Sequence, residues 1–327
     1  MMNVGIIGCG MIGQKRANAI NGLAKIKHCF DLSAESSSKF SKRNNCIQAF
    51  SVDEILNDSE VNLIVIATRH DSLADLSKAV IESGKNLLVE KPGALNSREF
   101  EQIITSHKNS AKTKIHVGYN HQFHPAILKA KEICKSEEFG KIMFLRGRYG
   151  HGGRIGYESE WRATKSLSGG GELIDQGSHL IDLAITFLGE LKLDYASTPT
   201  YYWDMDVEDN VFMSLKNQDG AIAFLHASCT EWKNMFSLEI YGEKGKVEIS
   251  GLGGSYGQET ITFHRMKPEM GPPESQTWKF SGDDESWRTE FEFLLKDIRE
   301  DSNFSNNIES SAIVLKLIGD IYLGSGR

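Results

Sequence analysis

The stretch VGIIGCGMIG, residues 4–13, is a short apolar run followed by three glycines in a G-x-G-x-x-G pattern. In a strand–turn–helix context, Gly8 permits a tight turn, Gly10 leaves room for a pyrophosphate, and Gly13 lets the helix pack closely on the strand. Amides at the start of the helix would receive the phosphate charge. Glycine-rich turns also recur for purely structural reasons, so this motif needs support from the rest of the chain.

The sequence after this motif alternates apolar runs with helical stretches, as a parallel sheet with crossover helices requires. Each run is apolar throughout, which is typical of strands covered on both faces. We predict an α/β, doubly wound Rossmann domain over residues 1–120. The expected strands are Val4–Ile7, Ile26–Phe30, Leu63–Ala67, Leu87–Val89 and Ile115–Tyr119, and the expected helices are Gln14–Leu23, Ser72–Ser83 and Ser97–His107.

Beyond Phe123 the pattern changes to two helices and then alternating strands separated by turn signals. This pattern predicts an α+β domain over residues 121–327 with a large, mostly antiparallel, open-faced sheet. The expected helices are Pro125–Ser136, Glu172–Leu188, Trp287–Arg299 and Ile308–Leu323, and the strands are Val207–Leu215, Ala221–Thr230, Phe236–Tyr241, Lys246–Ser250 and Thr260–Met266.

Length, charge and cysteine usage exclude several classes of protein. A chain of 327 residues exceeds the usual single-core domain, so two domains sharing a cleft are expected. The net charge of −7 has no long basic block, which argues against nucleic-acid binding. The five scattered cysteines have no C-x-x-C spacing, so we expect neither disulfides nor a metal site. Without an apolar run of membrane-spanning length or a signal-peptide pattern, we expect a cytoplasmic protein.

Asp31 ends the second predicted strand, about 20 residues beyond the glycine motif. A carboxylate there can accept both ribose hydroxyls of NAD and would repel the 2′-phosphate of NADP. No arginine is adjacent, so the sequence favours NAD over NADP. Alternatively, Asp31 caps the next helix.

Lys91 follows the strand Leu87–Val89 and therefore lies at the carboxyl edge of the sheet, where such folds bind ligands. Pro92 restricts the backbone of the lysine. A solvated surface lysine is the alternative, but a buried strand before Lys91 indicates that its ammonium group points into a cleft.

Taken together, these motifs resemble the glucose-fructose oxidoreductase, inositol dehydrogenase and rhizopine-catabolism (Gfo/Idh/MocA) family over nearly the whole chain. The resemblance rests on Gly8–Gly13, Ala67-Thr68, Glu90-Lys91-Pro92, Gly118-Tyr119-Asn120 with His124-Pro125, and Gly169-Gly170-Gly171 leading to Asp175, His179 and Asp182.

The resemblance implies that Lys91, Asp175 and His179 are catalytic. Residues four apart share a helical face, so Asp175 and His179 can point together into a cleft. The carboxylate can orient the imidazole, which can act as a general base, while the lysine polarises the substrate oxygen. Whether Lys91 or His179 is the base stays open. A surface i,i+4 pair is the alternative, and no third residue completes a metal site.

Further site residues follow from the motifs and the resemblance. Arginine-rich residues 146–165 would suit an anionic substrate, although alternate arginines on a strand can simply face solvent. We expect the cofactor to contact Gly8, Gly10, Met11, Ile12, Gly13, Asp31, Thr68, His70, Glu90, Lys91 and Asn120. We expect the substrate to contact Lys91, Tyr149, Arg154, Trp161, Arg162, Asp175, His179 and His226.

The resulting hypothesis is a dehydrogenase or reductase that moves a hydride between nicotinamide and a secondary alcohol or ketone of a sugar, cyclitol or sugar nucleotide. The same fold also hosts a glycosidase that retains NAD, and a non-catalytic dinucleotide sensor is a third class. The resemblance further implies a homodimer or homotetramer assembled through the C-terminal sheet.

Overall fold

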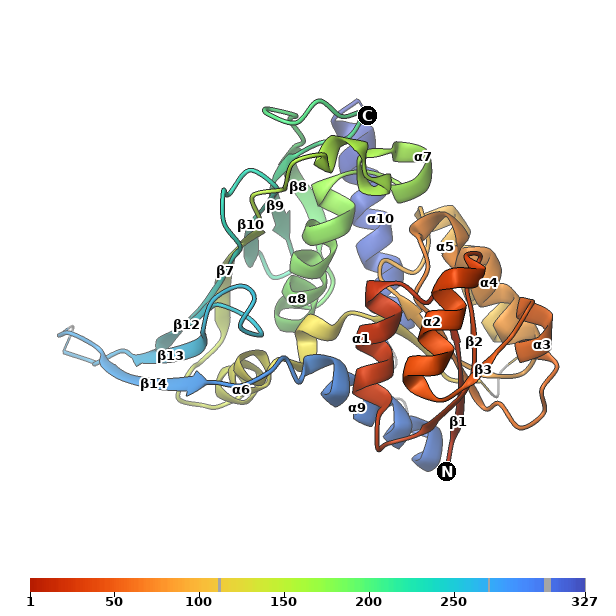
Figure 1. Cartoon of the computed structure of the whole chain (residues 1–327). Coiled ribbons are helices and arrows are strands. Elements are labelled where there is room, and N and C mark those ends of the chain that lie inside the picture. The colour runs from red at the N-terminus through yellow and green to blue at the C-terminus, as the bar shows by residue number, and fades with distance from the viewer. Residues whose placement is uncertain (111–112, 270, 303–306, 327) are drawn as a thin grey trace. The chain divides into compact units, whose positions relative to one another are not determined.

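The computed structural model describes residues 1–110, 113–269, 271–302 and 307–326. The chain divides into two compact units (Figure 1). The first comprises Met1–Tyr119 and Trp287–Ala312, and the second comprises Asn120–Ser286 and Ile313–Arg327.

The first unit contains a six-stranded parallel sheet with the order β3-β2-β1-β4-β5-β6. This order is that of a Rossmann fold, and it confirms the predicted doubly wound domain. The direction of winding reverses between β1 and β4, which places the ligand-binding edge at their carboxyl ends. The strands are β1 (Asn3–Ile7), β2 (Lys25–Phe30), β3 (Ile47–Gln48), β4 (Leu63–Ile66), β5 (Asn86–Glu90) and β6 (Ile115–Gly118).

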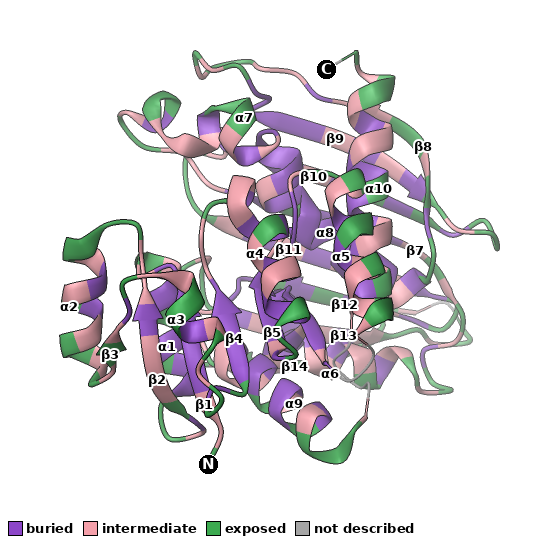
Figure 2. Ribbon diagram, turned by 90° about the vertical axis from the view of Figure 1, so that its right-hand side faces the viewer, coloured by how far each residue is buried: buried purple, intermediate pink, exposed green. Residues whose placement is uncertain are grey.

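Helices cover both faces of this sheet. Val4 and Ile6 point to one face, where they share a core with residues of α1, α2 and α9. On the other face, Ile55 of α3 lies against Gly5, and α4 packs on β4, β5 and α5. Every residue of β4 is buried, as Figure 2 shows for this strand. The helices are α1 (Met11–Ile20), α2 (Ala34–Asn44), α3 (Val52–Leu56), α4 (His70–Glu82), α5 (Ser97–Asn109) and α9 (Ser286–Glu300).

Three elements of the first unit have no counterpart among the predicted elements: α2, β3 and α3. Helix α2 is rich in serine and lysine, so its apolar periodicity is weak. Its start is nevertheless capped, because the Ser33 side chain accepts a hydrogen bond from the Ser36 amide at 3.2 Å. Strand β3 has only two residues, which is too short for a pattern.

The second unit contains an eight-stranded sheet with the order β14-β13-β12-β11-β7-β10-β9-β8. All neighbours pair antiparallel except β10 and β7, which are parallel, so the predicted mostly antiparallel sheet is confirmed. The strands are β7 (Ile142–Gly150), β8 (Lys192–Ser197), β9 (Asn210–Lys216), β10 (Ile222–Ser228), β11 (Met235–Gly242), β12 (Gly245–Ser250), β13 (Glu259–Arg265) and β14 (Glu274–Phe280).

Helix α8 packs on one face of this sheet. Gly147 of β7 leaves room there for Leu180 of α8, for Leu225 of β10 and for Leu238 of β11. Alternate residues of β10 point to the other face, where Phe224 is 53% exposed. The remaining helices of the unit are η1 (Asn120–Phe123), α6 (Pro125–Cys134), η2 (Tyr157–Ser159), η3 (Trp161–Ala163), α7 (Lys165–Ser168), η4 (Leu173–Gly177), α8 (Ser178–Leu188) and α10 (Ile308–Gly324), the last of which begins in the first unit.

Strands β8 and β14 have no counterpart among the predicted strands, and two further features differ from the sequence-based expectation. The segment predicted as one helix over Glu172–Leu188 is divided into η4, which is a π-helix, and the α-helix α8. Helix α9 groups with the first unit, because Phe291, Leu294 and Leu295 enter the core beneath β1 and β4. Among the described helices, none combines the length and apolar composition needed to cross a lipid bilayer.

Candidate active site

The glycine turn after β1 is shaped by close backbone contacts. Gly8 has a φ of +99°, and a Cβ there would lie 2.5 Å from the carbonyl oxygen of Ala67. A Cβ on Gly13 would lie 2.0 Å from the Gly8 carbonyl oxygen. These two glycines are therefore required by the fold itself.

Gly10 is different, because the protein around it leaves open space. Its φ of −74° suits any residue, and a Cβ there would meet nothing within 4 Å. The open space lies directly before Met11 and Ile12 at the start of α1. A phosphate group could approach the backbone amides here, so the turn fits a dinucleotide.

Asp31 follows β2 and is held by two backbone amides. Its Oδ2 accepts a hydrogen bond from the Cys9 amide at 2.7 Å, and its Oδ1 accepts one from the Ser33 amide at 2.8 Å. The carboxylate is thus fixed beside the glycine turn. This position suits recognition of a ribose with free hydroxyl groups.

The other predicted cofactor residues of the first unit follow β4 and β5 at the same edge of the sheet. The Thr68 hydroxyl accepts a hydrogen bond from Ser72 at 2.8 Å. His70 is buried and begins α4. Lys91 directly follows β5 and is partly exposed. The fold therefore brings these side chains to the edge where parallel sheets bind ligands.

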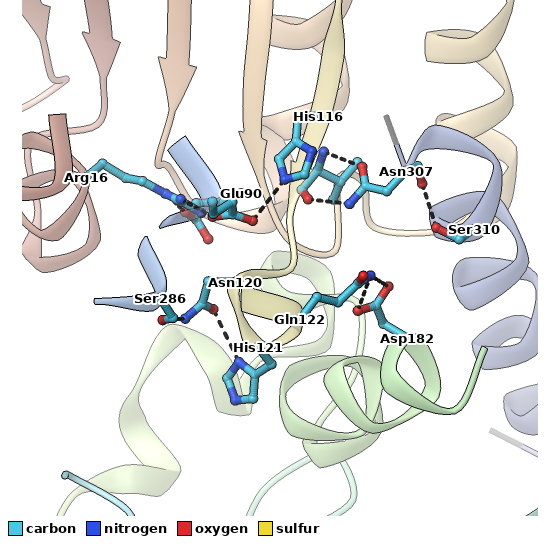
Figure 3. A network of polar contacts seen from close by, with 12 residues as sticks. Arg16, Glu90, His116, Asn120, His121, Gln122, Asp182, Ser286, Asn307 and Ser310 are labelled. Atoms are coloured by element: carbon cyan, nitrogen blue, oxygen red, sulfur yellow. Dashed lines mark hydrogen bonds and ion pairs between the residues drawn. The ribbon is translucent and has the colours of Figure 1, made fainter. Parts of the chain in front are cut away.

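Glu90 belongs to a buried ion cluster that the sequence did not reveal (Figure 3). Its Oε1 accepts a hydrogen bond from Arg16 Nε at 2.6 Å, and Arg16 also pairs with Glu290 of α9. The His116 ring lies 2.9 Å from Glu290. Burial favours the neutral acid, but Arg16 and the hydrogen bond from His116 still lower the pKa of Glu290. The cluster ties α1, β5, β6 and α9 together.

In the second unit, Asp175 lies on the π-helix η4 and pairs with Arg162. Arg162 Nε donates a hydrogen bond to Asp175 Oδ2 at 3.0 Å. The guanidinium group also lies over the ring of Trp161, 4.6 Å from its centroid. A short π-helix inside an α-helix is often found at functional sites. Arg162 therefore forms an ion pair with Asp175 and fixes the direction of its carboxylate.

His179 lies one turn further on, at the start of α8, and stacks on His121. The two ring centroids are 3.8 Å apart with an interplanar angle of 28°. His121 in turn contacts Asn120, whose amide donates to Ser286, as Figure 3 shows. The ring of Tyr149 lies edge-on to both histidines. Asn120 and Tyr149, predicted as cofactor and substrate contacts, thus belong to the surroundings of His179.

The start of this helical segment is anchored by buried Glu208. Its Oε1 accepts hydrogen bonds from the amides of Gly171 and Leu173 at 3.1 and 3.0 Å, and from the Tyr322 hydroxyl at 2.7 Å. A Cβ on Gly170 would lie 1.9 Å from that hydroxyl. The glycine run therefore lets Glu208 satisfy amides that the helix itself leaves unpaired.

Asp182, one turn beyond His179, is fully buried and accepts two hydrogen bonds from the Gln122 side chain, both at 2.9 Å. Lys131 of α6 donates to Gln122 at 3.1 Å. Burial lowers the pKa of Lys131 to about 8, although the Asp182 carboxylate opposes this shift. The polar chain joins α6, η1 and α8.

The arginines of residues 146–162 are each paired with an acidic side chain. Arg162 pairs with Asp175 as described, and Arg154 pairs with Glu160. The two arginines of β7 pair in the same way, Arg146 with Glu239 and Arg148 with Glu231. The arginine density that suggested an anionic substrate is thus matched by carboxylates of the protein itself.

His226, a predicted substrate contact, points to the face of the sheet opposite α8. Its strand neighbour Leu225 faces Leu180 of α8, and strand side chains alternate between faces. His226 stacks on Phe212 at 4.2 Å and contacts Asn210. We therefore leave it out of the site that we propose below.

Comparisons with known proteins give the same picture at the level of the family. Residues 2–119 match the model of the oxidoreductase family with an NAD-binding Rossmann fold, Gfo/Idh/MocA. Residues 127–248 match a Gfo/Idh/MocA C-terminal domain. Together, the two matches cover most of the chain.

Several relatives and solved structures resemble the chain over most of its length. Levoglucosan dehydrogenase of Pseudarthrobacter phenanthrenivorans is 25% identical, with 75% of this chain and 73% of that protein covered. Inositol 2-dehydrogenase of Salmonella paratyphi B is 22% identical, with 76% and 74% covered. A levoglucosan dehydrogenase structure with NADH and L-sorbose has a TM-score of 0.89 at 21% identity, covers 100% of this chain and 97% of that one, and supports the fold.

Proposed function

This chain belongs to the Gfo/Idh/MocA family of NAD-binding oxidoreductases, and from that premise we propose that it interconverts a secondary alcohol and a ketone on a neutral sugar or cyclitol. The observation that carries the proposal is the placement of Asp175 and His179 on one helical segment, with Arg162 paired to the carboxylate. This arrangement offers an oriented imidazole for proton transfer.

NAD, when bound, supplies the hydride acceptor or donor. In the proposal, Asp31 accepts the hydroxyls of the adenosine ribose, and the open space at Gly10 admits the pyrophosphate. Lys91 holds the reacting oxygen of the substrate through its ammonium group. His179 accepts the hydroxyl proton in the direction of oxidation and returns it in the direction of reduction.

The choice of His179 as the base follows from ordinary side-chain chemistry. A histidine usually titrates near neutrality, whereas a lysine usually keeps its proton well above it. The ion pair with Arg162 makes Asp175 a poor proton acceptor, because protonation would break that pair. Asp175 is therefore proposed to orient the reacting groups rather than to exchange protons.

The proposed substrate is neutral because the arginines are already matched. Their pairing with Glu160, Glu231, Glu239 and Asp175 leaves no excess positive charge in residues 146–162 to bind a carboxylate or phosphate. The substrates named for the relatives, levoglucosan and inositol, are uncharged and therefore head the panel to be tested.

The test is NADH formation by the purified protein with NAD and a panel of neutral sugars and cyclitols. We expect stoichiometric NADH with at least one panel member. Lys91→Met and His179→Gln should each lower kcat by about 10²- to 10⁴-fold, while Lys39→Ala, at an exposed ion pair, should not. Glycosidic cleavage without net NADH would favour the glycosidase of this fold, and NAD binding with no turnover would favour a sensor.

We also propose that the chain forms a homodimer or homotetramer through the face of the eight-stranded sheet opposite α8. Ile222 and Phe224 of β10 are 38% and 53% exposed there, and the rings of Phe144 and Tyr241 stack beside them. Light scattering should give a multiple of 36.5 kDa for the native protein and a lower mass for Phe224→Lys. A monomeric native protein would contradict the proposal.

A further inference from the structure

His121 is a second buried histidine against the proposed base. His121 and His179 are only 7% and 5% exposed. The two rings lie nearly parallel, 3.8 Å apart. The geometry therefore couples the position of the His179 ring to that of His121.

A chain of hydrogen bonds fixes the proton on His121. The Asp284 carboxylate accepts a hydrogen bond from the Ser286 hydroxyl at 2.5 Å, so Ser286 Oγ must accept the one from Asn120 Nδ2 at 2.8 Å. The amide oxygen of Asn120 then faces His121 Nδ1 at 3.2 Å. The Nδ1 atom of His121 therefore carries a hydrogen and donates it to that oxygen.

Other rings hold His121 on its remaining sides. Tyr149 lies edge-on at 5.0 Å, His124 at 5.6 Å and Phe236 at 6.2 Å between ring centroids. His124 is itself fixed by Glu259 at 3.0 Å. A ring packed in this way has little freedom to move.

The stacked pair can carry one positive charge but resists a second. Two unit charges at this separation repel each other enough to change a proton affinity by roughly a thousandfold in a partly polar interior. The titratable groups on the surrounding elements include Asp175 and Asp182 on the helical segment of His179, Lys131 of α6, Tyr149 of β7, and His124, Glu259 and Asp284 beside His121.

We propose that His121 is a positioning residue for the proposed reaction. Its uncharged ring holds the His179 ring in place by stacking while His179 exchanges the substrate proton. The neutral ring also presents its π face to the imidazolium that forms on His179, which stabilises that charge. This inference rests on the proposed role of His179.

The kinetic test compares two substitutions of His121 under steady-state conditions. His121→Ala removes the ring that stacks on His179, so kcat should fall about tenfold or more with KM within about twofold of the native value. His121→Phe restores a flat ring and should recover kcat to within about threefold. Phe263→Leu, which alters a buried ring pair with Phe139 that includes neither histidine, should keep the native kcat. Equal losses in His121→Ala and His121→Phe would overturn the proposal.

A second test does not depend on activity. Nitrogen-15 NMR of the histidine rings should show that the titration midpoint of His121 rises by about one pH unit or more when His179 is changed to Phe, because the competing charge is removed. An unchanged midpoint would refute the coupling. If the midpoint of His121 shifts as expected but the protein forms no NADH, the coupling between the two rings stands and the proposed function is refuted instead.

Discussion

The two sheets of this protein differ in how they meet solvent. In the first unit, β4 is buried at every position, because helices cover both faces of its sheet. In the second unit, β10 alternates between exposed and buried residues, because α8 covers only one face. The first sheet is thus a scaffold closed on both sides, whereas the second has a surface left over for other contacts.

The same difference governs where the candidate site residues come from. In the first unit they follow β1, β2, β4 and β5 at one edge of the sheet, so each is marked by the end of its own strand. In the second unit they meet as pairs from distant segments, such as Arg162 with Asp175 and His121 with His179. The four predictions below test this contrast, from the largest expected effect to the smallest.

The closed scaffold should depend most strongly on its buried ion cluster. Arg16→Met removes the buried cation that pairs with both Glu90 and Glu290 and leaves Glu290 with His116 alone, so the first unit should lose about 3–5 kcal/mol of unfolding free energy. Hydrogen exchange measured by mass spectrometry would report this loss for each unit separately. The exposed pair of Lys39 and Glu35 supplies the control, and Lys39→Ala should cost less than about 1 kcal/mol. Equal protection in the two variants would contradict the proposed importance of the cluster.

The second unit should depend on the orientation of Asp175. Arg162→Ala should lower kcat by about 10- to 100-fold, because the carboxylate loses the group that directs it. Arg162→Lys should recover only part of the loss, because an ammonium group lacks the planar fork. Arg265→Ala, at a surface ion pair with Glu138, is the matched control. A native kcat for Arg162→Ala in steady-state kinetics would show that the reaction does not need the Asp175–Arg162 pair.

Two glycines of the nucleotide turn should respond differently. Gly10→Ala should leave the stability of the protein without cofactor unchanged but weaken NAD binding by about tenfold, because the added methyl occupies ligand space. Gly13→Ala should lower that stability by about 1–3 kcal/mol, because its Cβ would collide with the Gly8 carbonyl. Calorimetry and thermal unfolding separate these effects. A destabilised Gly10→Ala protein would mean that the fold itself requires this glycine.

The smallest effect concerns pH and Lys131. Its folded pKa of about 8 lies below the usual value for lysine, so the folded state binds fewer protons than the unfolded state, and stability should rise between about pH 8 and pH 10. Lys131→Met should be more stable than the native protein at neutral pH, by on the order of 1 kcal/mol. Urea unfolding at several pH values should show this difference shrinking as pH rises. A constant difference would indicate that Lys131 titrates normally.

Periodicity and spacing predicted much of this molecule. Continuous apolar runs located five strands of the first sheet, and the glycine motif with Asp31 and Lys91 marked one edge of it, because these signals are local in the sequence. The π-helical turn around Asp175 and the pairing of Glu290 with Arg16 depend on contacts between distant residues. Single-sequence patterns carry no record of such contacts. For His226 the sequence supplies half of the answer. Alternation along β10 places His226 on the face opposite Leu225, but only the packing of α8 shows that Leu225 is on the covered face.

The central claim is that a hydride passes from a substrate carbon to NAD. The most direct measurement uses a panel member that supports NADH formation, prepared with deuterium on the carbons that bear hydroxyl groups. We predict that mass spectrometry will find one deuterium in each NADH formed, and that Lys91→Met will slow its appearance. Recovery of the deuterium in solvent or only in the sugar product, with undeuterated cofactor, would contradict the account.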